Sequence, residues 1–277
     1  MMLRRLGVIG AGGIADVALS TLAERLASPL EQVTILVPAD FAPQAQKLLD
    51  RLGDKLASSR KVVTDITALL NDQPDAVAEC ASHTAVRDYG TKILGSGCDL
   101  VLISIGSLSD ESLRSELELA ARRGGSRLVL PAGAIGGIDS LVAAKLSGLE
   151  SVTYIGRKPP KAWVGTAAEK IVDLHGLTKP TAFFEGNARE AARDYPFNAN
   201  VAATLGLAGI GFEQTKVRLV ADPDVSRNVH EFVVRSACGD FSVRLEGRPS
   251  AVNPKTSLMA GFSVARELLN RAGNLVI

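Results

Sequence analysis

Short apolar runs alternate with helix-like patterns through the first 131 residues of the chain. The first run, residues 6–9, is followed by apolar residues at helical spacing, namely Val17, Leu19, Leu22 and Leu26. Further apolar runs follow at 33–37, 62–63, 76–79, 100–105 and 127–130, with helical patterns between most of them. Strands that alternate with helices in this order predict a doubly wound α/β domain, with a parallel sheet covered on both faces.

The turn after the first apolar run has the glycine spacing of a dinucleotide-binding site. It reads G-x-G-x-x-A, with Gly10 at the tight turn, Gly12 where a pyrophosphate approaches, and Ala15 where the helix meets the strand. The N-terminus of the following helix offers free N–H groups to phosphate. Because the motif lies between a strand and a helix, it predicts a Rossmann domain in which Gly10, Gly12, Gly13 and Ile14 contact the cofactor. The alternative is a purely structural turn.

The end of the second predicted strand bears on which cofactor binds. An acidic residue there bonds the ribose 2′-hydroxyl of NAD, whereas a basic residue favours the 2′-phosphate of NADP. Asp40 is the acidic candidate, but Pro38 and Ala39 precede it and leave its direction open. We therefore expect NAD as the cofactor, with some use of NADP.

The pattern changes after residue 131. A loop of small residues leads into a predicted helix at 139–146, and a helix of small residues follows at 198–206. Runs at 230–236 and 241–245, joined by the turn 238–240, predict an antiparallel hairpin, with 217–220 as a partner strand. This half is predicted to be a second, α+β domain with a mainly antiparallel sheet.

A final helix is predicted from residues 253–254 onward, and we expect it to pack back on the first domain. Its apolar face is predicted to consist of Leu258, Met259, Phe262, Leu268 and Leu269. The expected domains are residues 1–131 with 253–277 for the dinucleotide, and residues 132–252 for substrate and catalysis. We expect the second domain to pair two chains in a homodimer.

Composition excludes several classes of partner. Lys and Arg number 31 against 30 Asp and Glu, which gives no basic surface for nucleic acid or an anionic membrane. No apolar run has the length of a membrane span. The three cysteines, Cys80, Cys98 and Cys238, are unevenly spaced without a C-x-x-C pair. We therefore expect no metal site and no disulfides, but reduced thiols in a cytoplasmic protein.

Hydride transfer needs a group that manages protons, and histidine is the usual choice near neutral pH. His83 follows the fourth predicted strand and is interpreted as a helix-start residue. His175 is interpreted as a cationic cap at a helix end. His230 begins a strand of the second domain and is the catalytic candidate, with a buried structural histidine as the alternative.

The second half of the chain resembles the aspartate dehydrogenase family, and the resemblance extends over essentially the whole sequence. The matching motifs occur in the same order, at residues 132–139, 156–160, 162–163, 165–166, 184–188, 198–203, 222–231 and 253–257. The departures are Pro131-Ala132 in place of a Ser-Gly type pair, and the offset of Asp40.

The resemblance implies oxidation of L-aspartate with NAD or NADP to iminoaspartate. That product hydrolyses to oxaloacetate and ammonia or enters NAD biosynthesis. By the same resemblance, His230 matches the catalytic histidine, Ala134 a cofactor contact, and Asn200 another, with Asn198 as its alternative. The two substrate carboxylates need cationic or N–H partners, for which Lys158 and Lys255 are candidates.

Two other functions stay open. One is a related two-domain oxidoreductase of the dihydrodipicolinate-reductase or sugar type. Sugar enzymes typically carry Glu-Lys-Pro after the fifth strand, whereas residues 103–107 contain no lysine. The other is a regulator that senses NAD(H) without turnover, which the even charge balance and the absence of an extra domain disfavour.

Overall fold

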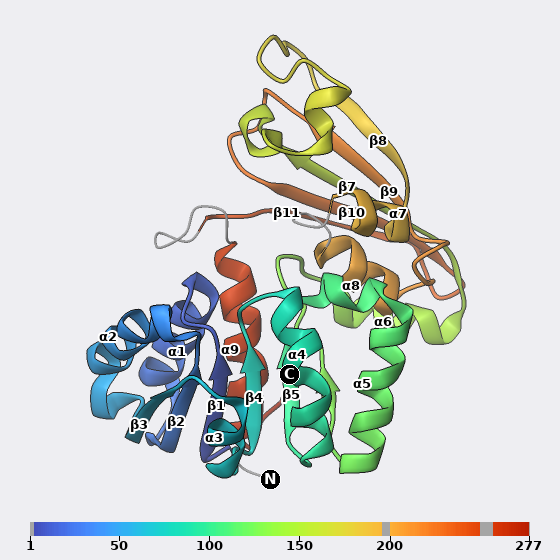
Figure 1. The fold of residues 1–277 in the computed structure, drawn as a ribbon. Helices are drawn as coiled ribbons and strands as arrows, with labels where there is room; N and C mark the ends of the chain where they lie inside the picture. Colours follow the sequence, from blue (N-terminus) through green and yellow to red (C-terminus); the bar gives the residue numbers. More distant parts are fainter. Residues whose placement is uncertain (1–2, 196–199, 250–256, 277) are drawn as a thin grey trace. The chain divides into compact units, whose positions relative to one another are not determined.

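The computed structural model describes residues 3–195, 200–249 and 257–276. The chain divides into two compact units. The first consists of Met1–Pro131 with Ser250–Ile277, and the second of Ala132–Pro249. Each unit has its own sheet, and each is described by itself (Figure 1).

The first unit is built on a six-stranded parallel sheet in the order β3-β2-β1-β4-β5-β6. Its strands are β1 (Arg5–Ile9), β2 (Leu30–Leu36), β3 (Ala57–Val63), β4 (Ala76–Glu79), β5 (Asp99–Leu102) and β6 (Leu128–Val129). The chain reverses direction across the sheet between β1 and β4, and ligands of doubly wound sheets bind at the carboxyl ends of the strands near this point. The predicted Rossmann architecture is confirmed.

Helices cover both faces of this sheet. They are α1 (Gly13–Arg25), α2 (Ala42–Leu52), α3 (Ile66–Asn71), α4 (His83–Gly95), α5 (Glu111–Gly124) and α9 (Leu258–Ala272). One core joins α1, α2 and α9 to alternate strand residues such as Leu6, Val8, Val33 and Ile35. The α4 and α5 helices pack against each other, and Leu117 fills the space beside Gly90.

Local sequence explains where several of these helices begin and end. Asp65, Ser82 and Asp110 precede α3, α4 and α5, and each side chain accepts a hydrogen bond from a first-turn N–H. Gly125 ends α5 in the left-handed conformation, which glycine adopts without a Cβ clash.

The second unit is built on a five-stranded mixed sheet in the order β11-β10-β7-β9-β8. Its strands are β7 (Leu149–Lys158), β8 (Thr181–Asn187), β9 (Lys216–Ala221), β10 (Val229–Ser236) and β11 (Phe241–Glu246). All neighbouring pairs are antiparallel except β7 with β9. The helices of this unit are α6 (Ile138–Ser147), α7 (Ala188–Asp194) and α8 (Asn200–Ala208). The predicted α+β unit with a mainly antiparallel sheet and the hairpin of β10 and β11 are confirmed.

Four local predictions are wrong. The fifth strand ends at Leu102 rather than at residue 105, because the chain turns into a 3-10 helix, η3 (Ile105–Ser109). The strand β9 does not adjoin the hairpin, since β7 lies between them. His175 lies in an exposed bend, where its N–H bonds Asp173, and not at a helix end. In α9, Met259 and Phe262 are exposed, while Gly261, Val264 and Ala265 face inward.

Candidate active site

The glycine turn lies at the carboxyl edge of the first sheet, between β1 and α1. Gly10 has a φ of +93°, and its N–H donates to the carbonyl of Leu36 at 2.9 Å, which ties the turn to the end of β2. A Cβ at Gly10 would lie 3.0 Å from the carbonyl oxygen of Cys80. The tight turn and its close contact with the chain after β4 therefore both require glycine.

Gly12 is at the N-terminus of α1, and its surroundings differ. It is exposed, has the extended φ of −84°, and would place a Cβ in open space with nothing within 4 Å. As the N-cap residue it brings no side chain to the first-turn N–H groups of Gly13 and Ile14. Glycine is thus not needed here for packing, and the open helix end has the form of a phosphate-binding site. These residues fit a dinucleotide.

A buried acidic side chain connects two neighbouring loops by hydrogen bonds at the carboxyl edge of the first sheet. Glu79, at the end of β4, is 1% exposed. Its Oε1 accepts from the N–H groups of Ala81 and Ser82, both at 2.8 Å, and from the hydroxyl of Ser104 at 3.0 Å, while Oε2 accepts from the N–H of Ser104 at 3.0 Å. Glu79 therefore fixes the two loops that follow β4 and β5. Sequence reasoning missed it, although an acidic residue that ends a short buried strand is a usable signal.

Asp40 lies in the short 3-10 helix η1 (Ala39–Phe41), three residues beyond the last buried residue after β2. Its side chain is exposed. The structure thus places Asp40 near the carboxyl end of β2, as the sequence suggests for a ribose contact.

In the second unit, His230 lies on β10 and is only 6% exposed. Its Nδ1 is 2.8 Å from the hydroxyl of Tyr154 on β7, a residue that is 1% exposed. Burial, together with the charge of Lys158, lowers the pKa of His230 to about 3. Burial also raises the pKa of Tyr154 above its ordinary value, so the phenol stays protonated.

Lys158 ends β7 on the same side of the strand as Tyr154, because side chains alternate along a strand. Its Nζ lies 5.0 Å from the ring centroid of Trp163, in a cation–π arrangement. Burial lowers the pKa of Lys158 to about 8. The structure therefore brings two predicted site residues together, His230 and Lys158, and adds Tyr154, which sequence reasoning missed because its pairing depends on strand register.

The remaining predicted residues occupy separate places. Ala134 is half-buried in the loop before α6, and Asn200 begins the described part of α8, where it is exposed. His83 begins α4 directly after the cap residue Ser82, as expected. Asn198 and Lys255 lie outside the described residues.

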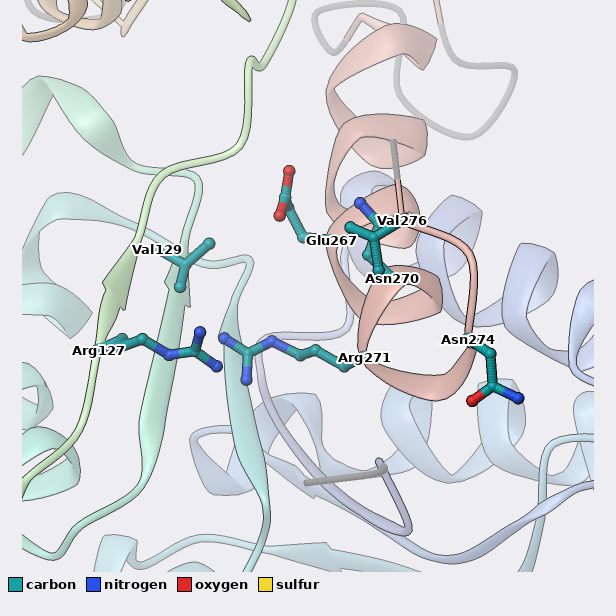
Figure 2. A pocket seen from close by; sticks show the side chains of 8 residues that line it. Arg127, Val129, Glu267, Asn270, Arg271, Asn274 and Val276 are labelled. Atoms are coloured by element: carbon teal, nitrogen blue, oxygen red, sulfur yellow. The ribbon is translucent and has the colours of Figure 1, made fainter.

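A pocket of about 470 Å³ opens at the other edge of the first sheet and contains none of the predicted residues (Figure 2). Arg127 and Arg271 point toward each other across it. Both guanidinium groups bond Oδ2 of Asp99, at 2.9 Å and 2.7 Å. These contacts hold the end of α9 against the sheet, which is a structural role.

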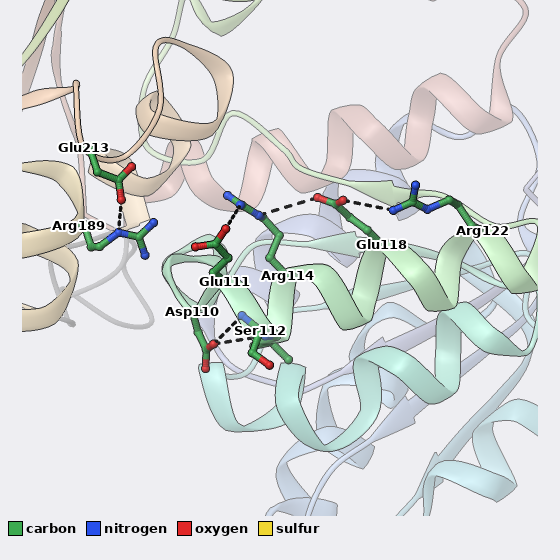
Figure 3. Close-up of polar contacts among 9 residues, drawn as sticks. Asp110, Glu111, Ser112, Arg114, Glu118, Arg122, Arg189 and Glu213 are labelled. Carbon is green, nitrogen blue, oxygen red and sulfur yellow. Dashed lines mark hydrogen bonds and ion pairs between the residues drawn. The ribbon is translucent and has the colours of Figure 1, made fainter.

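Surface charges on α5 and beside α7 also have structural partners (Figure 3). Arg114 lies between Glu111 and Glu118 at 3.7 Å and 3.9 Å, and such exposed pairs contribute at most about 1 kcal/mol each. Arg189 pairs with Glu213 in the second unit. Neither group forms a reactive cluster.

Among the described residues, no group of three or more His, Cys, Asp or Glu side chains is arranged to hold a metal ion. No helix in that part of the chain is both long and apolar enough to span a bilayer. Cys80, Cys98 and Cys238 are all free thiols.

Two family models match the chain, one on each side of residue 131. Residues 10–131 match the NAD-binding domain of homoserine dehydrogenase, and residues 139–271 match the C-terminal domain of aspartate dehydrogenase. The first match supports a pyridine nucleotide cofactor, in agreement with the glycine turn of Gly10 and Gly12.

Relatives and a solved structure extend the similarity over the chain. An L-aspartate dehydrogenase of Ralstonia nicotianae is 46% identical over 86% of this chain and 87% of its own. That of Pseudomonas aeruginosa is 44% identical over 96% of both chains. The crystal structure of aspartate dehydrogenase from Thermotoga maritima covers 100% of this chain and 99% of its own, with 27% identity and a TM-score of 0.73. The chain is an oxidoreductase that belongs to the L-aspartate dehydrogenase family.

Proposed function

We propose that the chain oxidises L-aspartate to iminoaspartate, with NAD or NADP as the hydride acceptor. The observation that carries the proposal is the buried His230 with the half-buried Lys158 on the adjoining strand. Both lie in the part of the chain that matches the aspartate dehydrogenase C-terminal model. Relatives that match 86% and 96% of the chain are L-aspartate dehydrogenases. Iminoaspartate then hydrolyses to oxaloacetate and ammonia or supplies NAD biosynthesis.

The cofactor contacts proposed in the first unit are Gly10, Gly12, Gly13 and Ile14 at the pyrophosphate and Asp40 at the adenosine ribose. Those proposed in the second unit are Ala134 and Asn200, with Asn198 as the alternative to Asn200. When bound, the nicotinamide ring accepts a hydride from Cα of the substrate. The exposed carboxylate of Asp40 favours NAD over NADP, because it would repel a 2′-phosphate.

His230 is the proposed catalytic residue. Its Nδ1 is engaged by Tyr154, so Nε2 is the nitrogen that remains for the substrate or for the water that attacks the imine. Lys158 and Lys255 are the proposed partners of the substrate carboxylates, as cations that recognise anions. We also propose that the protein acts in the cytoplasm as a homodimer, which sedimentation equilibrium tests directly.

Substrate screening tests the proposed function. We expect NADH absorbance to rise at alkaline pH with L-aspartate, and not with other amino acids, malate or sugars. Turnover of a sugar, or reduction of dihydrodipicolinate by NADPH, would favour the related oxidoreductases. Cofactor binding without turnover of any of these compounds would favour a sensor of NAD(H).

Replacement of His230 tests the catalytic assignment. We expect His230→Ala to lower kcat by about 10²–10⁴-fold, the usual contribution of a positioned acid–base group, with nearly unchanged NADH affinity. Full activity, or a loss confined to cofactor binding, would contradict this role.

A further inference from the structure

We propose that Glu79 is a positioning residue for the dinucleotide, because its side chain joins the loops after β4 and β5 into one unit at the cofactor-binding edge. The inference rests on the nicotinamide cofactor of the proposed function and extends it to a residue that acts through its neighbours. Both loops follow strands that end at the carboxyl edge of the first sheet, where Glu79 pairs with Leu102 across β4 and β5. That edge also carries the glycine turn and is where ligands of doubly wound sheets bind.

The two carboxylate oxygens of Glu79 bond different loops. Oε1 accepts from the N–H groups of Ala81 and Ser82 in the loop after β4, both at 2.8 Å. Oε2 accepts from the N–H of Ser104 in the loop after β5, at 3.0 Å. The hydroxyl of Ser104 also donates to Oε1 at 3.0 Å, so this one residue bonds both oxygens. Since Glu79 is only 1% exposed, these four bonds connect the loops without competition from water.

The buried carboxyl group depends on these donors. Burial raises the pKa of Glu79, and the hydrogen bonds from Ala81, Ser82 and Ser104 oppose that rise. If either loop moved away, a buried oxygen would lose its donor, and the cost of leaving such a group unpaired exceeds the net gain of an ordinary hydrogen bond. Glu79 therefore disfavours every arrangement in which the two loops separate.

The loop after β4 lies directly against the glycine turn. A Cβ at Gly10 would lie 3.0 Å from the carbonyl oxygen of Cys80 and also 3.0 Å from Cβ of Ala81. The N–H of Cys80 donates to the carbonyl of Ile9 at 2.9 Å, immediately before the turn. Ala81 is also one of the residues whose N–H bonds Glu79. A shift of this loop would therefore displace the turn on which the pyrophosphate is proposed to bind.

The loop after β5 is fixed by a second buried serine. The carbonyl of Ser104 accepts from the N–H of Ser107 at 3.0 Å and from its hydroxyl at 2.8 Å, at the start of η3. Ser104 and Ser107 are both buried. The turn into η3 is thus rigid in itself, and Glu79 sets its position relative to the loop after β4. Through this one side chain, the β5 loop, the β4 loop and the glycine turn keep a fixed arrangement.

Glu79→Gln tests this role with little change of shape. An amide nitrogen cannot accept a hydrogen bond, so a glutamine that keeps its oxygen on the β4 loop turns its –NH2 toward the N–H of Ser104. The bond to the β5 loop is then lost. We expect NADH to bind at least about fivefold more weakly, as fluorescence titration measures, and the protein to unfold at a lower urea concentration. NADH affinity equal to that of the wild type overturns the proposal.

Asp75→Ala is the matched control, because Asp75 is an acidic residue just before the other end of the same strand. Its Oδ2 accepts from the N–H groups of Arg4 and Arg5, both at 2.7 Å, and ties the start of β1 to the start of β4. We expect this variant to lose stability but to bind NADH within about twofold of the wild type, since the change is at the amino edge of the sheet. If Asp75→Ala weakens NADH binding as much as Glu79→Gln does, the effect is one of general stability and the proposal is overturned.

Hydrogen exchange of the apoprotein reports on the loops without cofactor or substrate. We expect residues 80–84 and 103–107 to exchange faster in Glu79→Gln than in the wild type, while β11 in the second unit exchanges alike in both. If Glu79→Gln does not fold, Ser104→Ala, which removes only the hydroxyl bond, takes its place. We then expect faster exchange in the same segments and NADH affinity lowered by about twofold or more. Unchanged exchange at both loops overturns the proposal.

Steady-state kinetics separate this inference from the proposed function. We expect the KM for NAD to rise in Glu79→Gln in step with the weaker NADH binding, whereas the KM for L-aspartate stays near the wild-type value. A wild type that binds NADH but does not oxidise L-aspartate contradicts the proposed function and leaves the role of Glu79 intact. Oxidation of L-aspartate by both proteins with equal KM for NAD overturns the role of Glu79 and leaves the proposed function intact.

Discussion

Gly10 and Gly12 share one turn but lack side chains for different physical reasons. Gly10 combines a positive φ with a close contact to the chain after β4, so the fold itself requires glycine there. Gly12 has an ordinary φ and open space at its Cα. If the turn were purely structural, Gly12 would have no reason to be glycine, whereas an approaching pyrophosphate supplies one.

Alanine at Gly12 should therefore affect cofactor binding, whereas alanine at Gly10 should affect stability. We expect Gly12→Ala to change the free energy of unfolding by less than about 1 kcal/mol, while NADH affinity falls at least about tenfold because the methyl group occupies the path of the phosphates. We expect Gly10→Ala to destabilise the fold by about 1–3 kcal/mol through backbone strain and the contact with Cys80.

Urea unfolding and NADH fluorescence titration measure the two quantities separately. A Gly12→Ala protein that binds NADH as tightly as the wild type would argue for the purely structural turn.

Tyr154 contributes one buried hydroxyl to the environment of His230. We expect Tyr154→Phe to lower the free energy of unfolding by about 1–3 kcal/mol, because Nδ1 of His230 is left without its 2.8 Å partner. The ratio of the two neutral tautomers of His230 should also change, which nitrogen NMR measures. Tyr195→Phe, in the aromatic cluster of Trp163 and Phe183, is the control and should leave the His230 signals unchanged.

At the scale of elements, α9 and α1 pack too closely for large side chains. A Cβ at Gly261 would lie 2.6 Å from Cβ of Val17 and 3.3 Å from the carbonyl oxygen of Ile14. Val17 is β-branched and cannot easily turn away within a helix. The helix that returns from the second half of the chain thus contacts the first turn of the dinucleotide-binding helix through a glycine.

We expect Gly261→Ala to lower the free energy of unfolding by about 1–3 kcal/mol through overpacking, even though alanine favours a helix over glycine by about 1 kcal/mol. NADH affinity should fall as well, since Ile14 lies at the contact.

Addition of Val17→Ala should restore both quantities in the double variant, as thermal unfolding and NADH titration would show. Gly95→Ala in α4, where a Cβ meets nothing within 4 Å, is the control and should not destabilise. Additive losses in the double variant would contradict the proposed contact.

The helix α9 shows how far the secondary-structure elements could be predicted from the sequence. Periodicity predicts a terminal helix, which the structure contains as α9, but it assigns Met259 and Phe262 to the buried face. The error arises because size is a poor guide where two helices approach closely and small residues are required. The strand β7 was not predicted either, since Arg157 and Lys158 give its end a polar character.

Some residues of the candidate site could be predicted from the sequence, and others could not. The glycine turn follows from a local motif, and His230 follows from resemblance to a family. Glu79 and Tyr154 bond groups that are 25 and 76 residues away in the chain, so only the folded register reveals their partners. Local patterns predict what lies within a few residues, whereas buried hydrogen bonds across a sheet require the tertiary structure.

For the whole molecule, a few buried groups matter more to the pH response than net charge. The chain carries a formal net charge of +1 at pH 7, so overall repulsion is small. His230 and Lys158 both have a pKa below the ordinary value, which means that the unfolded chain binds more protons than the folded one. Both groups therefore make the folded state less stable as pH falls.

The contribution of neutral, buried His230 to the free energy of unfolding is fully present above about pH 6.5. It declines as pH falls toward 3, by up to about 1.4 kcal/mol per pH unit. Asparagine does not titrate, so we expect the His230→Asn variant to lack this pH-dependent loss of stability. The stability difference between wild type and variant should then be constant from pH 7 to 8 and should shift by about 2–3 kcal/mol in favour of the variant at about pH 4.5.

Trp163 is the only tryptophan and is fully buried in the second unit, so its emission during urea unfolding reports on the unit that contains His230. Carboxylates that protonate over the same range affect wild type and variant alike, and their contribution cancels in the difference. His175→Asn is the control, because it removes an exposed histidine and keeps the buried His230. Its free energy of unfolding should follow the same pH dependence as that of the wild type. If the wild type and His230→Asn instead run parallel from pH 7 to 4.5, then His230 takes up a proton as readily in the folded chain as in the unfolded one. In that case the folded environment does not disfavour the imidazolium form of His230, which would contradict the lowered pKa.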